Sequence, residues 1–133
     1  MQLFEKKQVH GESFLKTKEL KSLLPTPYPT HYVEPSAFKL ELLHQYAKKG
    51  SPIFFNEFVK AFPNFTKKLL SQAPTLVLKE IELCAYSRLH FGTQEIALYT
   101  RLSVRAIESR KYRIRKKLQL KKGDNFLLWL IEL

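Results

Sequence analysis

Along most of the chain after residue 35, apolar residues recur at intervals of three and four, and this spacing constrains the fold more than any other feature. Such spacing places apolar side chains on one face of an α-helix. Glycine occurs only 4 times in 133 residues, which argues against a turn-rich fold of β-strands. The pattern therefore predicts an all-α protein.

Breaks in this pattern separate seven expected helices. Their ranges are 35–49, 51–62, 64–72, 78–89, 95–99, 104–118 and 125–133. Ser51, Asn64 and Ser103 are expected to cap the helices that follow them, and Gly50 to end the first one. The side chains expected on inward faces are Phe38, Leu42, Leu43, Tyr46, Phe54, Phe55, Phe58, Phe62, Ile81, Cys84, Ala85, Leu89, Ile96, Tyr99, Ile107, Ile114 and Leu118.

The N-terminal quarter of the chain has a different pattern. Residues 12–24 have only a weak helical pattern, with Leu20, Leu23 and Leu24 inward, and four prolines between residues 25 and 35 indicate an extended connector. The predicted organisation is an arm and Pro-rich connector (1–34), a helical lead-in (35–74) and a C-terminal domain (75–133).

Positive charge is concentrated in one short segment. The chain carries 23 Lys and Arg against 12 Asp and Glu, a net charge of +11. Residues 101–122 alone hold 10 basic residues and one acidic residue, Glu108, so this segment contributes +9. A charge excess of this size favours a polyanionic partner.

The basic segment overlaps the predicted helix 104–118, and a helical projection separates its side chains by chemistry. Ile107, Ile114 and Leu118 fall on one narrow apolar seam. Side chains about 100–240° around the helix from Ile107 form the opposite face; they are Arg105, Glu108, Ser109, Tyr112, Arg113 and Lys116. A helix of this kind suits the major groove of DNA, where arginine pairs with guanine edges and flanking cations contact phosphates.

Glu108 allows two interpretations. Its carboxylate could accept a hydrogen bond from a cytosine amino group, or it could pair within the helix with Tyr112 or Arg105. A short helix near 93–99, a tight turn at 101–103 and the basic helix also have the order of a helix-turn-helix.

The segment from Leu76 to Leu120 resembles the LuxR-type (GerE-like) DNA-binding domain of bacterial transcription regulators. The matching pieces are Leu83-Cys84-Ala85 with Arg88-Leu89, Glu95-Ile96-Ala97, Ser103 to Glu108, and Lys111 to Leu120. Two positions depart from the family pattern, because Val77 replaces a capping threonine and Gly92 replaces a common capping serine. Glu95 keeps half of a capping box beside Gly92.

The resemblance implies a four-helix domain with 104–118 as the recognition helix and Glu80 in a structural role. Its base-edge positions fall on Arg105, Glu108, Ser109, Tyr112 and Arg113, in agreement with the projection. The candidate phosphate contacts are Arg101, Arg110, Lys111, Arg115, Lys116 and Lys117.

The last predicted helix is apolar around its whole circumference. Phe126, Leu130 and Leu133 can close the core, which leaves Leu127, Leu128 and Ile131 in need of a second partner. That partner is either the N-terminal helices or a second copy of the chain. The resemblance favours a homodimer, which would place two reading helices about 34 Å apart on inverted half-sites.

Catalysis has no support in the sequence, so we expect no enzyme and no cofactor. His10, His31, His44 and His90 lack metal-ligand spacing, and the single cysteine, Cys84, is expected in the core. The longest apolar run has six residues, too short to cross a membrane, and no signal peptide is evident. We expect a cytoplasmic, nucleoid-associated protein.

Sequence-specific binding of double-stranded DNA as a transcription regulator is the function that these features favour. RNA polymerase and a sensor protein are further candidate partners. Two other hypotheses stay open: a helical protein-interaction adaptor whose basic helix only aids solubility, and a non-specific nucleic-acid binder.

Overall fold

The computed structural model describes residues 34–133, and this part of the chain contains seven helices and no strand. The helices are α2 (Ala37–Lys48), α3 (Phe54–Ala61), α4 (Pro63–Gln72), α5 (Leu78–Arg88), α6 (Thr93–Thr100), α7 (Val104–Lys117) and α8 (Phe126–Ile131). The all-α prediction is confirmed for these residues. The helix predicted at 12–24 and all of the predicted connector except Glu34 lie outside the described residues.

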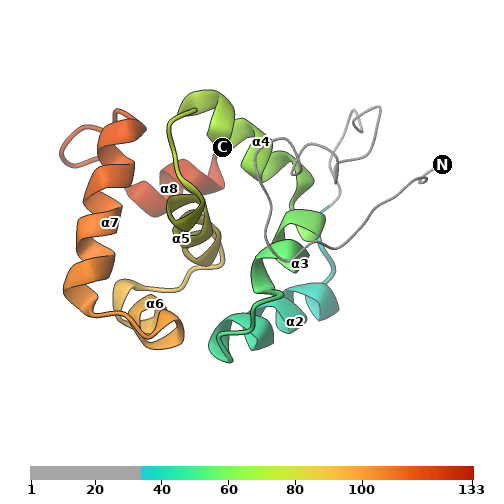
Figure 1. The fold of residues 1–133 in the computed structure, drawn as a ribbon. Coiled ribbons are helices and arrows are strands. Elements are labelled where there is room, and N and C mark those ends of the chain that lie inside the picture. Colours follow the sequence, from blue (N-terminus) through green and yellow to red (C-terminus); the bar gives the residue numbers. More distant parts are fainter. Residues whose placement is uncertain (1–33) are drawn as a thin grey trace.

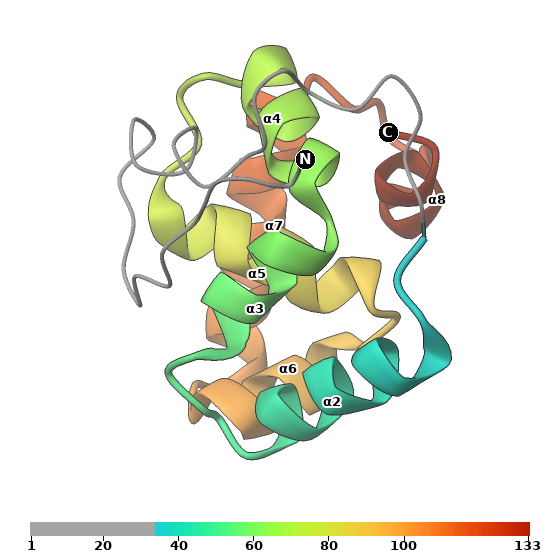
Figure 2. The ribbon, with the colours of Figure 1, turned by 90° about the vertical axis from the view of Figure 1, so that its right-hand side faces the viewer.

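Helix α5 occupies the middle of the molecule and packs against α3, α7 and α8 (Figure 1). Helix α7 lies on the side of α5 away from α2 and α3 and also packs on α6. Helix α2 packs on α3, and its C-terminal end reaches α6, as the view in Figure 2 shows. The basic helix is therefore held from behind by α5 and α6.

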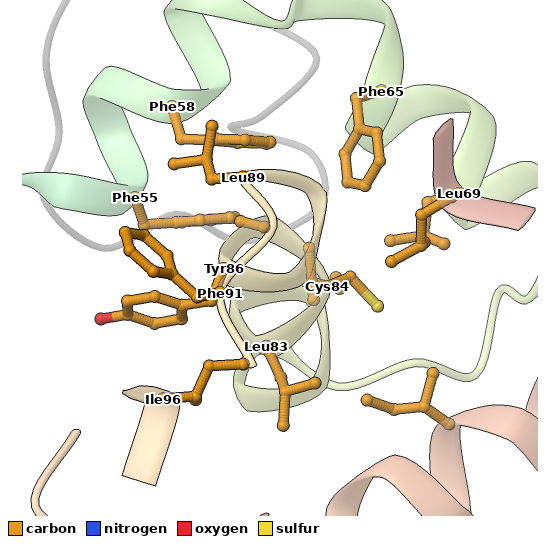
Figure 3. Packing of buried hydrophobic residues seen from close by; sticks show 14 of the residues in the cluster. Phe55, Phe58, Phe65, Leu69, Leu83, Cys84, Tyr86, Leu89, Phe91 and Ile96 are labelled. Atoms are coloured by element: carbon orange, nitrogen blue, oxygen red, sulfur yellow. The ribbon is translucent and has the colours of Figure 1, made fainter. Parts of the chain in front are cut away.

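One continuous hydrophobic cluster runs through the lead-in and the C-terminal segment. Figure 3 shows Phe55 and Phe58 of α3 facing Tyr86 and Leu89 at the end of α5. Aromatic contacts reinforce this packing, since the ring of Phe54 stacks on that of Tyr86 with a centroid distance of 4.6 Å. The phenylalanines of α3 are packing residues, as their spacing predicted.

The chain supplies the caps that most of these helices need. The Ser103 hydroxyl accepts a hydrogen bond from the Ala106 backbone N–H at 3.0 Å, as predicted. Where Val77 and Gly92 offer no side-chain cap, their own backbone N–H groups donate to Glu80 and Glu95 at 3.0 and 2.8 Å. The half capping box predicted at Gly92 is thus present.

Three local predictions are wrong. Phe38 is 75% exposed, because the buried side of α2 is centred on Leu43 and Ala47, and Phe38 lies about 140° away from Leu43 around the helix. Helix α3 begins only at Phe54, because the residues after Ser51 form a turn before it.

The third error concerns α4. Asn64 does not cap this helix, which begins one residue earlier, at Pro63. Proline suits the first helical position because it has no N–H to satisfy and its φ is already helical. Helix α4 then ends at Gln72, just before Pro74, as predicted.

Candidate nucleic-acid interface

Helix α7 is docked by the apolar seam that its sequence predicts. Ile107 and Ile114 are completely buried and Leu118 is nearly so. These side chains face α5 and α6, which pack on α7 from one side. The other side of the helix forms an outer edge of the molecule (Figure 1).

The five predicted base-edge residues lie together on this outer side. All five, Arg105, Glu108, Ser109, Tyr112 and Arg113, are exposed. Tyr112 is the large apolar side chain of the group, with 62% of its surface accessible. Lys116 extends one turn back along the helix, and its Nζ lies 5.3 Å from the centroid of the Tyr112 ring. A ring and a cation in this arrangement restrict one another's rotamers.

Glu108 makes neither of its possible intrahelical pairs. No hydrogen bond or ion pair joins its side chain to Arg105 or Tyr112 among the described residues. Its charge acts instead on Lys111, where it opposes a lowering of the lysine pKa that burial causes. The contact with cytosine stays a prediction.

The turn between α6 and α7 is built around Arg101. This residue adopts a left-handed conformation with φ of +60° and ends α6, where its N–H bonds to the last turn. Ser103 then caps α7 two residues later. The turn directs α7 across α6, and the side chain of Arg101, three residues before α7, is exposed.

The candidate phosphate contacts divide into two groups. Lys111, Arg115 and Lys117 are committed to contacts within the chain. The ammonium of Lys111 donates to the Thr93 hydroxyl at 2.9 Å, and Arg115 donates to the Lys121 carbonyl at 2.9 Å. Arg101 and Lys116 are exposed, and Arg110 borders a groove of about 200 Å³ beside Glu82.

Lys117 donates two hydrogen bonds to other parts of the chain. Its Nζ donates to Oε1 of Glu80 at 2.8 Å and to the Thr75 carbonyl at 3.1 Å. Glu80 is only 3% exposed. If the Lys117 ammonium moved away to bind a phosphate, the buried carboxylate would lose its hydrogen-bonded cation, which is energetically costly. Lys117 thus binds α7 to the start of α5.

Glu80 collects several donors. Burial alone raises the pKa of its carboxyl, but hydrogen bonds from Lys117 and the Val77 N–H, together with the charges of Lys117 and Arg113, outweigh this and lower the pKa overall. The group is therefore ionised at neutral pH. Nε of Arg113 lies 3.8 Å from its Oε2. The resemblance assigned Glu80 a structural role, but its partners on α7 are more than 30 residues away and no local pattern indicates them.

Helix α8 divides largely as predicted, except that Leu127, expected on the outer face, is partly buried. Leu130 is buried against the core, with Phe126 and Leu133 partly buried beside it. Leu128 and Ile131 point outward, 50% and 40% exposed, and Leu127 is half-buried. Leu128 and Ile131 thus stay partly accessible among the described helices, and Ile131 borders a groove that Phe65 and Lys68 of α4 also line.

The described residues give little support for a reactive cysteine, a metal site or a membrane-spanning helix. Cys84 is completely buried in the core, and burial raises the pKa of its thiol. Residues 34–133 hold no group of three or more His, Cys, Asp or Glu side chains that could bind a metal ion. Within the same range, every helix is too short or too polar to cross a lipid bilayer.

Comparison with known proteins adds no family to this description. No protein-family model, curated protein or solved structure matches the chain. The geometry of α5 to α8 and the sequence motifs are therefore the basis for assigning a function.

Proposed function

We propose that this protein binds double-stranded DNA with sequence specificity and regulates transcription. In this proposal α7 enters the major groove with Arg105, Glu108, Ser109, Tyr112 and Arg113 toward the base edges. Arg101 and Lys116 contact the phosphates beside them. The protein would act at the nucleoid in the cytoplasm of a bacterial cell.

One observation carries the proposal: α7 is buried along a single seam, and its opposite side is exposed. Ile107 and Ile114 anchor the helix while the five candidate base-edge residues on the opposite side remain exposed. Among the described residues, Arg105 and Ser109 make no side-chain hydrogen bond or ion pair, so both are available to a partner. A cationic convex helix matches the width and the negative potential of the major groove.

The domain type is part of the same proposal. Helices α5, α6, α7 and α8 follow one another in the order expected for a LuxR-type domain, and most of the motif residues fall on these helices. The capped turn between α6 and α7 supports a helix-turn-helix at the position that the resemblance implies.

We also propose that the protein acts as a homodimer through α8. Leu128 and Ile131 form an apolar surface on the outer side of this helix. A two-fold axis at α8 would bring two copies of α7 to successive major grooves, about 34 Å apart. Inverted repeats in the bound DNA would follow from this symmetry.

The decisive experiment is in vitro selection of duplexes with the full-length protein, followed by titration at several salt concentrations. A regulator should enrich an inverted repeat, and with about 5 phosphate contacts the slope of log K against log[salt] should be near −4 to −5. Binding with this slope but without enrichment would indicate a non-specific nucleic-acid binder. No binding at low salt would favour the adaptor hypothesis and contradict the proposal.

A further inference from the structure

We propose that Glu80 is a positioning residue that orients the guanidinium of Arg113 toward a guanine in the major groove. This inference rests on the proposed function. Under this inference Arg113 recognises one base pair of the binding site. The buried carboxylate of Glu80 on α5 then contributes to sequence selection by holding Arg113 in position.

The carboxylate of Glu80 is held in place from two sides. It lies in the first turn of α5, and Oε1 accepts hydrogen bonds from the Val77 N–H at 3.0 Å and from Lys117 Nζ at 2.8 Å. Its side chain is almost completely buried under the C-terminal half of α7. The group therefore cannot turn toward solvent, and Oε2 has a defined position.

Arg113 meets this fixed oxygen with one edge only. The distance of 3.8 Å from Nε to Oε2 is too long for a hydrogen bond but is an ion-pair distance. The side chain is still 54% exposed, and none of its nitrogens donates a hydrogen bond to another described residue. The Nε edge thus faces the protein, and the edge formed by the two Nη atoms is left without a partner.

Those two Nη atoms carry parallel N–H groups, and guanine presents two acceptors, O6 and N7, at matching spacing in the major groove. Arginine loses considerable rotamer freedom when it is fixed in one geometry. A side chain that a buried anion already attracts on its inner edge loses less on binding, so the correct base pair is favoured more strongly.

Glu80 also limits sequence-independent attraction. Its charge lies beneath two of the cations on this flank of α7, Lys117 and Arg113. Without it, both cations would be free to move toward phosphates. Removing the carboxylate should therefore weaken base discrimination while it strengthens binding to unrelated DNA, two effects that a purely structural residue would not produce together.

The test begins with the full-length wild-type protein and its selected duplex. Arg113→Ala identifies the base pair that Arg113 reads, as the position where selectivity falls. Glu80→Gln should lower discrimination at that same base pair about tenfold, raise affinity for an unrelated duplex, and leave the other base pairs unchanged. In the double variant, Glu80→Gln should cause no further loss at that base pair, because the reader is already absent.

A parallel loss of affinity for all sequences in Glu80→Gln would overturn the inference and leave Glu80 a structural residue. Arg113→Lys provides a second test that does not depend on a buried substitution. It keeps the charge but lacks the paired N–H groups, so discrimination at the same base pair should fall about tenfold with an unchanged salt slope.

Wild-type selectivity at every base pair in Arg113→Lys would show that Arg113 reads no base. That outcome contradicts this inference alone if the wild-type protein still enriches a repeat. If the wild-type protein enriches no sequence, the proposed function itself fails.

Discussion

A Cβ atom placed on Gly50, at the end of α2, would lie 2.9 Å from the carbonyl oxygen of Tyr99 in α6. The backbone at the end of α2 thus closely approaches that of α6. Gly50 also has a φ of +63°, a conformation that glycine adopts without penalty. The sequence predicted Gly50 as a helix stop, but the contact with Tyr99 exists only in the folded chain.

Gly50→Ala should therefore destabilise the protein by about 2 kcal/mol, roughly half from the left-handed backbone and half from the displaced α6. Urea unfolding followed by circular dichroism measures the change. Gly123→Ala is the matched control, because Gly123 also has a positive φ but has open space around its α-carbon. Equal losses of unfolding free energy in the two variants would show that the close contact between a Cβ at position 50 and the Tyr99 carbonyl does not destabilise the protein.

Arg105→Ala should weaken binding to the selected duplex by about 1–3 kcal/mol and relax preference at one base pair. Arg101→Asn is its counterpart, since asparagine tolerates the left-handed conformation at this turn. This variant should weaken all sequences alike and make the salt slope less steep by about 1. Fluorescence anisotropy with specific and unrelated duplexes separates the two. Identical behaviour of the two variants would contradict the assignment of Arg105 to a base edge and of Arg101 to a phosphate.

Leu128→Glu should convert the proposed dimer to a monomer without unfolding it, because half of this side chain is exposed. Analytical ultracentrifugation reports the mass, and thermal unfolding reports the fold. The buried neighbour serves for comparison: Leu130→Ala should cost about 2–5 kcal/mol of stability through the cavity it leaves. A wild-type protein that is already monomeric at high concentration would rule out the dimer.

The stability that the ionised Glu80 confers should depend on pH in a defined direction. Its pKa is lowered on folding, so this stabilisation is complete above the unfolded value of about 4.3 and is lost as pH falls through the lower folded value. The difference in unfolding free energy between wild type and Glu80→Gln should therefore be constant near neutral pH and shrink in acid. Urea titrations between pH 7 and pH 3, about the range of carboxyl titration, measure it. A difference that grows in acid would contradict the ion pair.

The thiol of Cys84 should react with an aromatic disulfide reagent only when the protein unfolds. The side chain is completely buried, and burial raises its pKa, so the reactive thiolate is both inaccessible and unpopulated. Absorbance after reagent addition, with and without denaturant, gives the reactive fraction. Rapid modification of the native protein would place Cys84 outside the core.

Predictions from local pattern agreed with the structure where one helix alone determines the outcome. The seam of Ile107, Ile114 and Leu118 follows from helical geometry, and the cap at Ser103 follows from its position before the first turn. Phe38 shows the limit of the same reasoning. An apolar side chain is buried only if a neighbouring element covers it, and nothing in the sequence of α2 shows where α3 lies.

The candidate site divides in the same way. By itself the sequence determined that α7 is basic, that one side of it is apolar, and which residues share its outer face, since helical periodicity fixes these relations within one segment. Tertiary structure alone decided which cations remain available. Lys117 and Lys116 are neighbours of equal charge, yet only Lys117 reaches the carboxylate of Glu80, 37 residues earlier in the chain. Such pairings depend on how α5 and α7 pack together, and no short-range pattern encodes that arrangement.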